Sequence, residues 1–323
     1  MGRGGGALVS TVAFLFPGQG SQAVGMGKDL AARHREAREV FDRADEILGF
    51  SLSTLCFEGP IEELTRTENT QPALLVTSVA AARVLEARGI RAGAGAGHSA
   101  GELVAHVVAR SLTFEDGLRF IRRRGEAMAG AGKDRPGSMV AVLGLSADQV
   151  DAVLTAVCMP NDLAAANYNS PGQVVFSGTE AALARASEEA KKAGAKKVVP
   201  LQVSAAFHSP LMEGASRGLS EALSRVTIGR AEFPVYANVS AQPVTEPEEI
   251  RDTLKRQLLM PVLWEQTVRA LLAAGFRRYV EVGNGRVLRG LVKSVDKDVA
   301  LLGTEDAETL EATVQTLQGV PAR

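Results

Sequence analysis

Cysteine and histidine are scarce in this chain of 323 residues. The two cysteines, Cys56 and Cys158, lie far apart without metal-ligand spacing, so they are expected to be reduced structural thiols. The four histidines form no HExxH motif, which argues against a zinc site of the metalloprotease kind. The sequence therefore predicts a protein without a metal centre.

Long apolar runs and an excess of charge of one sign are also missing. No run approaches the roughly 20 residues that cross a bilayer, and the stretch 11–16 is too short for the apolar part of a signal peptide. Residues 1–6 are expected to be a frayed leader, without the Ser or Thr of a myristoylation site. The formal net charge of -1 argues against broad nucleic-acid binding. We therefore expect a cytoplasmic protein that binds neither membrane nor nucleic acid.

The stretch 97–102, GHSAGE, places a glycine two residues before and two residues after Ser99. This is the pattern of a nucleophile elbow, in which a strand turns sharply into a helix and exposes the serine hydroxyl. The helical pattern from Glu102 to Arg110 would direct free N–H groups at the serine. A Gly/Ser loop is the alternative, because the glycine-rich residues 91–96 make a poor strand.

Two histidines are candidate general bases for Ser99. His208 stands where a strand gives way to a helix, which is where α/β folds present functional groups. His98 is adjacent to the serine, and neighbouring side chains at a turn usually point apart. His208 is therefore the better candidate. His34 lies in a charged, solvated helical pattern, and His106 lies on the helix that follows the serine.

Three consecutive arginines, starting at Arg122, lie within the helical pattern 113–129. The first two fit a solvated face. Arg124, in contrast, follows Ile121 by three residues and precedes Met128 by four, which places it on the apolar stripe. An arginine that faces the core is costly unless something anionic meets it. Anion binding is one hypothesis for Arg124, and an internal salt bridge is the other.

The rest of the chain alternates strand and helix patterns. The apolar run 12–16 predicts a buried strand that feeds the glycine-punctuated loop 17–22. A phosphate-binding loop is the alternative there, although its GxxxxGK[ST] motif is absent. Helices are expected over about 29–48, 71–88, 248–259 and 262–274, and strands over 234–239 and 279–282.

Residues 137–201 show the order β-α-β-β-α-β, which is the order of a ferredoxin-like unit. We predict an α/β protein with a large domain over 1–132 and 203–323 and an inserted small subdomain over 133–202. A cleft is expected at the junction of the two.

Taken together, these segments resemble the malonyl-CoA:acyl carrier protein transacylases, the acyltransferase family of fatty-acid and polyketide synthesis. The resemblance runs from Phe14 to about Gly290. It is carried, in order, by 16–22 (FPGQGSQ), 71–72 (QP), 97–102 (GHSAGE), 124–125 (RG), 167–173 (NYNSPGQ), 206–209 (AFHS), Gln257, Pro261, Val262, Trp264 and 281–283 (EVG).

The resemblance implies an α/β-hydrolase-like large domain that carries a ferredoxin-like (βαββαβ) subdomain. It implies Ser99 as the nucleophile and His208 as its general base and acid. The backbone N–H groups of Gln19 and Ala100 would form the oxyanion hole. Arg124 would hold the free carboxylate of a malonyl group.

Further roles follow from the same resemblance. Gln257 would orient the catalytic histidine through its main-chain carbonyl. His98, Phe207 and Asn167 would line the pocket, and Phe207 resembles the residue of the malonyl-selecting branch. The substrates would be malonyl-CoA and acyl carrier protein, with no cofactor, and the chain is expected to be a monomer.

Three other functions are compatible with parts of this pattern. A stand-alone, trans-acting acyltransferase of a polyketide synthase would have the same chemistry and a different carrier. A lipase or thioesterase would use the same elbow, but an acid should then follow a main-domain strand, which Asp116, Asp148 and Asp162 do not. A scaffold that only docks carrier protein is expected to have lost some of Ser99, His208 and Arg124, and all three are present.

Overall fold

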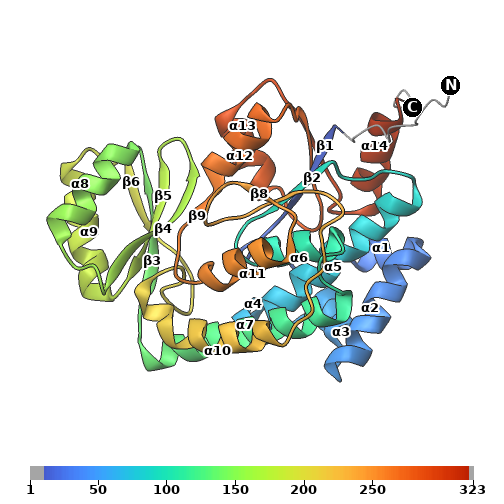
Figure 1. Cartoon of the computed structure of the whole chain (residues 1–323), viewed down its shortest axis with the longest axis horizontal. Helices are drawn as coiled ribbons and strands as arrows, with labels where there is room; N and C mark the ends of the chain where they lie inside the picture. Colours follow the sequence, from blue (N-terminus) through green and yellow to red (C-terminus); the bar gives the residue numbers. More distant parts are fainter. Residues whose placement is uncertain (1–10, 320–323) are drawn as a thin grey trace.

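A computed structural model describes residues 11–319 of the chain, so the expected leader at 1–6 lies outside the described residues. Two sheets organise the fold, one in the large domain and one in the small subdomain (Figure 1). The large sheet has the order β11-β10-β1-β2-β7-β8, in which only β8 is antiparallel to its neighbour. Its strands are β1 (Val12–Phe16), β2 (Ala94–Gly97), β7 (Val235–Tyr236), β8 (Pro243–Val244), β10 (Arg278–Glu281) and β11 (Ala300–Gly303).

Strand β1 shows why helices cover both faces of this sheet. Successive side chains of a strand point to opposite faces. Phe14 and Phe16 accordingly join the core formed with α5, α6 and α7, whereas Leu15 joins a second core formed with α12 and α13. The helices of the large domain are α1 (Lys28–Arg33), α2 (Arg35–Leu48), α3 (Leu52–Glu58), α4 (Ile61–Thr65), α5 (Thr67–Ala87), α6 (Ala100–Val108), α7 (Phe114–Asp134), η1 (Pro210–Met212), α10 (Glu213–Ser224), α11 (Pro247–Arg256), α12 (Trp264–Ala273), α13 (Val287–Val295) and α14 (Ala307–Gln318).

The small sheet has the order β6-β3-β5-β4-β9, and its first four strands have the ferredoxin-like arrangement. The predicted fold class is therefore confirmed. The end strand β9 comes from the large domain and pairs parallel to β4, so a strand links the two parts. The elements are β3 (Ser138–Leu143), α8 (Ala147–Val157), β4 (Leu163–Ser170), β5 (Gln173–Gly178), α9 (Glu180–Lys192), β6 (Lys197–Pro200) and β9 (Val262–Leu263).

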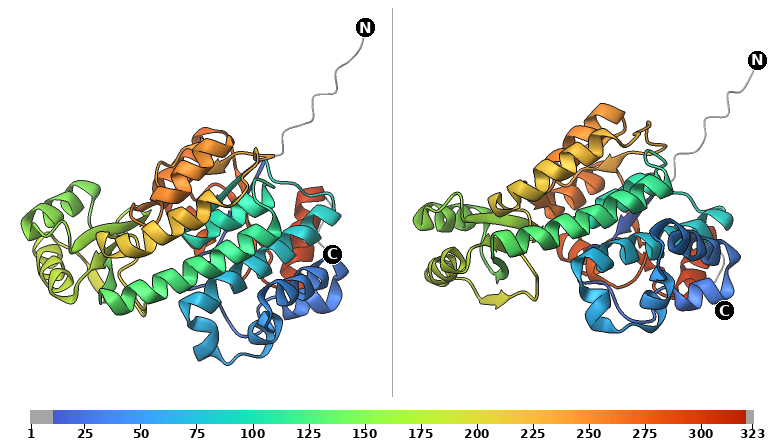
Figure 2. Two further views of the ribbon diagram at one scale, coloured as in Figure 1. Left: turned by 60° about the horizontal axis from the view of Figure 1, so that its bottom comes forward. Right: turned by 90° about the horizontal axis from the view of Figure 1, so that it is seen from below.

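Figure 2 shows the small subdomain at one end of the molecule, with α7 and α10 running toward it side by side. Helix α7 runs to Asp134. The domain boundaries at 132/133 and 202/203 stay a prediction.

Several predicted bounds are wrong. The helix expected over 29–48 is interrupted at His34, whose backbone is extended. The strand expected over 234–239 keeps only two residues, and the helix expected from 262 begins at Trp264, after β9. Residues 94–97, in the stretch expected to make a poor strand, form β2 and pair with β1 on one side and β7 on the other.

Helix α5 begins four residues earlier than predicted and so contains Pro72 in its interior. Proline has no N–H, which leaves the carbonyl of the residue four positions earlier without its helical donor. That residue is Glu68, and its carbonyl oxygen accepts a hydrogen bond from Arg122 instead (3.0 Å). Arg122 is therefore half-buried rather than solvated, whereas Arg123 is exposed as predicted.

Candidate active site

Ser99 stands between β2 and α6, where the chain turns sharply. Its backbone has φ 51° and ψ -108°, in a region that few residues adopt. A Cβ on Gly97 would lie 1.9 Å from the carbonyl carbon of Gly101, and a Cβ on Gly101 would lie 2.1 Å from the oxygen of Phe16. Both positions exclude any larger residue, so the stretch is a strand–turn–helix elbow and not a Gly/Ser loop.

His208 is the histidine that contacts the serine. Its Nε2 lies 2.7 Å from Ser99 Oγ, and its Nδ1 lies 2.9 Å from the carbonyl oxygen of Gln257 and 3.2 Å from that of Met260. Carbonyl oxygens only accept, so Nδ1 carries the proton and Nε2 is left to accept the serine proton. Two main-chain carbonyls thus stand where a hydrolase triad has a carboxylate.

Burial and the charge of Arg124 lower the pKa of His208 to about 3. The imidazole is therefore neutral at physiological pH, which is the form that a general base needs. His98 points elsewhere: its Nε2 lies 2.8 Å from Asn169 Oδ1, and its ring packs 5.6 Å from that of Trp264.

Arg124 is 3 % exposed and donates three hydrogen bonds. Its partners are Gln71 Oε1 (2.8 Å), Gln257 Oε1 (3.0 Å) and Ser99 Oγ (3.1 Å). Among residues 11–319 it forms no ion pair with a carboxylate, which speaks against the internal salt bridge. Burial lowers its pKa to about 10, so the guanidinium stays charged at neutral pH. A buried cation held by neutral oxygens beside the serine suits an anionic ligand.

Backbone donors approach the serine from two sides. The N–H of Ser99 itself is occupied, because it donates to Asn238 Oδ1 (2.8 Å). Ala100 begins α6, so its N–H belongs to the first turn, which has no intrahelical acceptor. The loop that contains Gln19 passes against the elbow: a Cβ on Gly18 would lie 2.5 Å from the carbonyl oxygen of His98.

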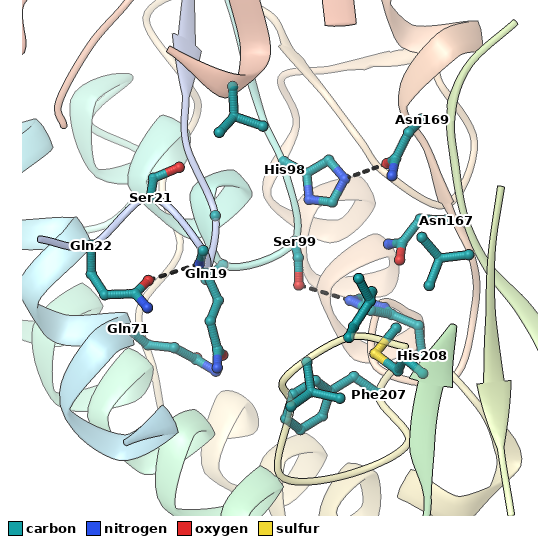
Figure 3. A pocket seen from close by; sticks show the side chains of 18 of the residues that line it. Gln19, Ser21, Gln22, Gln71, His98, Ser99, Asn167, Asn169, Phe207 and His208 are labelled. Atoms are coloured by element: carbon teal, nitrogen blue, oxygen red, sulfur yellow. Dashed lines mark hydrogen bonds between the residues drawn. The ribbon is translucent and has the colours of Figure 1, made fainter. Parts of the chain in front are cut away.

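These groups line a cavity of about 400 Å³ between the large domain and the small subdomain. Figure 3 shows Ser99 and His208 side by side at the cavity, joined by their hydrogen bond, with Asn167 and Asn169 of β4 close to them. The predicted residues that line it are Gln19, His98, Ser99, Ala100, Arg124, Asn167, Phe207 and His208. Gln257 lies behind the wall and reaches the site through its hydrogen bonds.

Four supporting residues were not predicted as site residues. They are Gln71, Glu102, Asn169 and Asn238. Glu102 ends the GHSAGE stretch, Gln71 lies in the QP pair and Asn169 lies in the NYNSPGQ stretch, so a signal existed for these three. Nothing in the sequence around Asn238 sets it apart.

Within the described part of the chain, no group of three or more His, Cys, Asp or Glu residues is placed to hold a metal ion. The same residues include no helix that is both long and apolar enough to cross a membrane.

Comparison with known proteins gives one consistent result. The family model described as "Acyl transferase domain" matches residues 13–317. The malonyl CoA-acyl carrier protein transacylase of Bacillus subtilis is 45% identical over 311 residues, which are 96% of this chain and 98% of that protein.

Solved structures agree with this. An acyl carrier protein S-malonyltransferase from Vibrio cholerae has a TM-score of 0.91 and 38% identity, and the match covers 94% of this chain and 100% of that one. A malonyl-transacylase in complex with a type II PKS acyl-carrier protein also has a TM-score of 0.91 and 38% identity, covering 95% of this chain and 100% of that one.

Proposed function

This chain belongs to the acyl transferase family, and we propose that it transfers a malonyl group from malonyl-CoA to the phosphopantetheine thiol of an acyl carrier protein. The relatives whose names state this activity match almost the full length of the chain. Within the site, the proposal rests on Arg124, a buried guanidinium that forms no ion pair with any carboxylate of residues 11–319 and that touches the hydroxyl of Ser99.

In the first half-reaction, Ser99 Oγ attacks the thioester carbonyl while His208 Nε2 takes the hydroxyl proton. The N–H groups of Gln19 and Ala100 stabilise the oxyanion, each contributing on the order of 3 kcal/mol. The C–S bond then breaks, and the sulfur leaves as CoA thiol with the proton from His208. The product is a malonyl ester on Ser99.

In the second half-reaction, the carrier thiol gives its proton to His208 and attacks the ester carbonyl. The C–O bond to Ser99 breaks, and the serine oxygen recovers the proton. The carbonyls of Gln257 and Met260 hold the imidazole in one orientation through both steps. Two products leave in turn, so the initial rates follow ping-pong kinetics.

The remaining expectations belong to the same proposal. His98, Phe207 and Asn167 shape the acyl pocket. The protein works as a cytoplasmic monomer without a cofactor. A fatty-acid carrier is the proposed acceptor, and a polyketide carrier is the alternative, because one of the similar structures is a malonyl-transacylase with a type II PKS acyl-carrier protein.

Arg124→Ala should weaken the use of malonyl-CoA by about 2–5 kcal/mol, the scale for truncating one partner of a buried charge pair. The use of acetyl-CoA should rise relative to malonyl-CoA, because an uncharged acyl group leaves the wild-type guanidinium unpaired. The measurement is kcat/KM for both donors. Arg123→Ala, an exposed neighbour on the same helix, is the matched control. Equal losses for both donors would show a structural role instead.

The acceptor distinguishes this transferase from a hydrolase. The malonyl-enzyme should persist in buffer and discharge rapidly when holo carrier protein is added, because the clamped carboxylate leaves little room for a well-placed water. Quenched-flow mass spectrometry of the intact protein follows both decays. Release of free malonate at a rate that carrier protein does not change would identify a hydrolase and overturn the proposal.

A further inference from the structure

One carboxylate oxygen of Glu102 accepts hydrogen bonds from both segments that support the reacting groups, the segment of Asn238 and the segment of Gln257. Glu102 is fully buried on α6, and its Oε2 accepts a hydrogen bond from the backbone N–H of Asn238 (2.9 Å) and one from Gln257 Nε2 (2.7 Å). Glu102 is not among the residues that line the cavity, and its carboxylate reaches the site through these two hydrogen-bond partners.

The first partner holds the elbow. Asn238 Oδ1 accepts from the N–H of Ser99 (2.8 Å), and its Nδ2 donates to the carbonyl of Gly97 (2.7 Å). These two hydrogen bonds hold the backbone at Gly97 and at Ser99, where the chain turns and Ser99 has a positive φ. A strained backbone persists only where its surroundings over-determine it. Glu102 fixes the backbone from which the Asn238 side chain extends.

The second partner holds the histidine and the arginine. The backbone oxygen of Gln257 accepts from His208, and its side-chain oxygen accepts from Arg124. Its Nε2 donates to Glu102 and also to the carbonyl of Ser99 (3.1 Å). A flipped amide would set the NH₂ group against the guanidinium, and both groups can only donate. Because Glu102 Oε2 accepts a hydrogen bond from the NH₂ group of Gln257, it favours the amide orientation in which the oxygen of Gln257 faces Arg124.

We propose that Glu102 is a positioning residue for acyl transfer, which acts through Asn238 on the nucleophile and through Gln257 on the base and on the arginine. The part that concerns the arginine rests on the proposed malonyl transfer. The part that concerns the serine and the histidine does not depend on which acyl group is carried.

This role requires an acceptor oxygen at the right distance from the backbone of residue 102, and it does not require a negative charge. A glutamine at position 102 keeps an acceptor oxygen at the same distance from the backbone, whereas an aspartate keeps the carboxylate on a stem one methylene shorter. Other buried groups close to Glu102 are polar or cationic: Arg124 is the charged neighbour, and Asn238 and Gln257 are neutral. Burial raises the pKa of Glu102 to about 7, so a neutral side chain is tolerable there.

The test compares Glu102→Gln with Glu102→Asp in the full-length protein. The first readout is the rate at which phenylmethanesulfonyl fluoride, an uncharged serine reagent, modifies Ser99. The second is the ratio of kcat/KM for malonyl-CoA to that for acetyl-CoA. Val104→Ala, a buried change on the same helix, controls for a loss of stability, which is followed by thermal unfolding.

Glu102→Asp should slow sulfonylation on the order of 10²-fold, as a misplacement of about 1 Å would, and should lower the malonyl-to-acetyl ratio. Glu102→Gln should stay close to the wild type in both readouts, and Val104→Ala should lower only the unfolding temperature. If Ser99 were sulfonylated slowly in Glu102→Gln and rapidly in Glu102→Asp, the effect would be due to charge. That result would overturn the proposal. Equal effects of Val104→Ala and Glu102→Asp on sulfonylation would do the same. A wild type that reacts with the sulfonyl fluoride but transfers no malonyl group would refute the proposed function alone.

Discussion

Incubation with malonyl-CoA should leave a covalent malonyl group on the wild-type chain, and the Ser99→Ala variant should carry none. The elbow exposes the hydroxyl of Ser99, whose Oγ lies 2.7 Å from Nε2 of the neutral His208 imidazole. Without its oxygen, His208 has no group to deprotonate, and no acyl-enzyme can form. Intact-protein mass spectrometry measures the label, and peptide mapping locates it.

The two cysteines are the rival nucleophiles and provide the controls. Burial raises the pKa of the Cys56 thiol to about 12, so almost no thiolate is present at neutral pH. Cys158 is exposed at the end of α8. Cys56→Ala and Cys158→Ser should both keep the full label. A malonyl group that maps to either cysteine would refute the assignment of Ser99.

The small subdomain was predictable because its signals are local. Each of its helices begins with a Ser or Thr cap, and Ser146 forms a complete capping box with Gln149. Turn residues separate β4 from β5 in the stretch 171–172. The strand β9 was missed because its two residues carry no strand pattern of their own, and they pair with a strand far away in sequence.

The start of α5 was missed for a related reason. Proline favours the first turn of a helix, so the sequence predicts a start near 71. The helix begins earlier because Arg122, on another helix, supplies the donor that Pro72 lacks. A tertiary contact thus overrides the local rule.

Within the site, the side chains that carry the chemistry could be identified from the sequence, whereas Asn238, which supports the elbow, could not. Ser99, His208 and Arg124 each combine a reactive side chain with an unusual place in the pattern. Asn238 contributes an ordinary amide, and its role exists only because the fold places it against the elbow. Periodicity and spacing contain no information about such a pairing.

His208→Ala should slow acylation of Ser99 on the order of 10⁴–10⁶-fold, since base and nucleophile act as a unit. The variant loses both the acceptor for the serine proton and the donor to the leaving thiolate. Rapid-quench measurement of malonyl-enzyme formation gives the rate. His98→Ala is the matched control: it removes the contact with Asn169 but leaves His208 in place, so its effect should be far smaller. If His98→Ala lost the activity and His208→Ala kept it, the base would be the wrong histidine.

The pH dependence gives an independent test of the same base. The folded-state pKa of His208 is about 3, below the ~6.5 of an unperturbed histidine, so the imidazole is already neutral across the range from 5 to 8. The rate of acylation by the free enzyme should therefore show no inflection near 6.5 in the wild type. The stability of the fold, in contrast, does depend on pH. Between the two pKa values the unfolded chain binds a proton at His208 that the folded chain does not, so the free energy of unfolding falls as the pH drops from about 6.5 toward about 3. Buried His106, whose pKa is also lowered to about 3, adds to this loss with the same sign. An inflection of the acylation rate near 6.5 that disappears in His208→Ala would show that the imidazole is solvated, in conflict with the buried site.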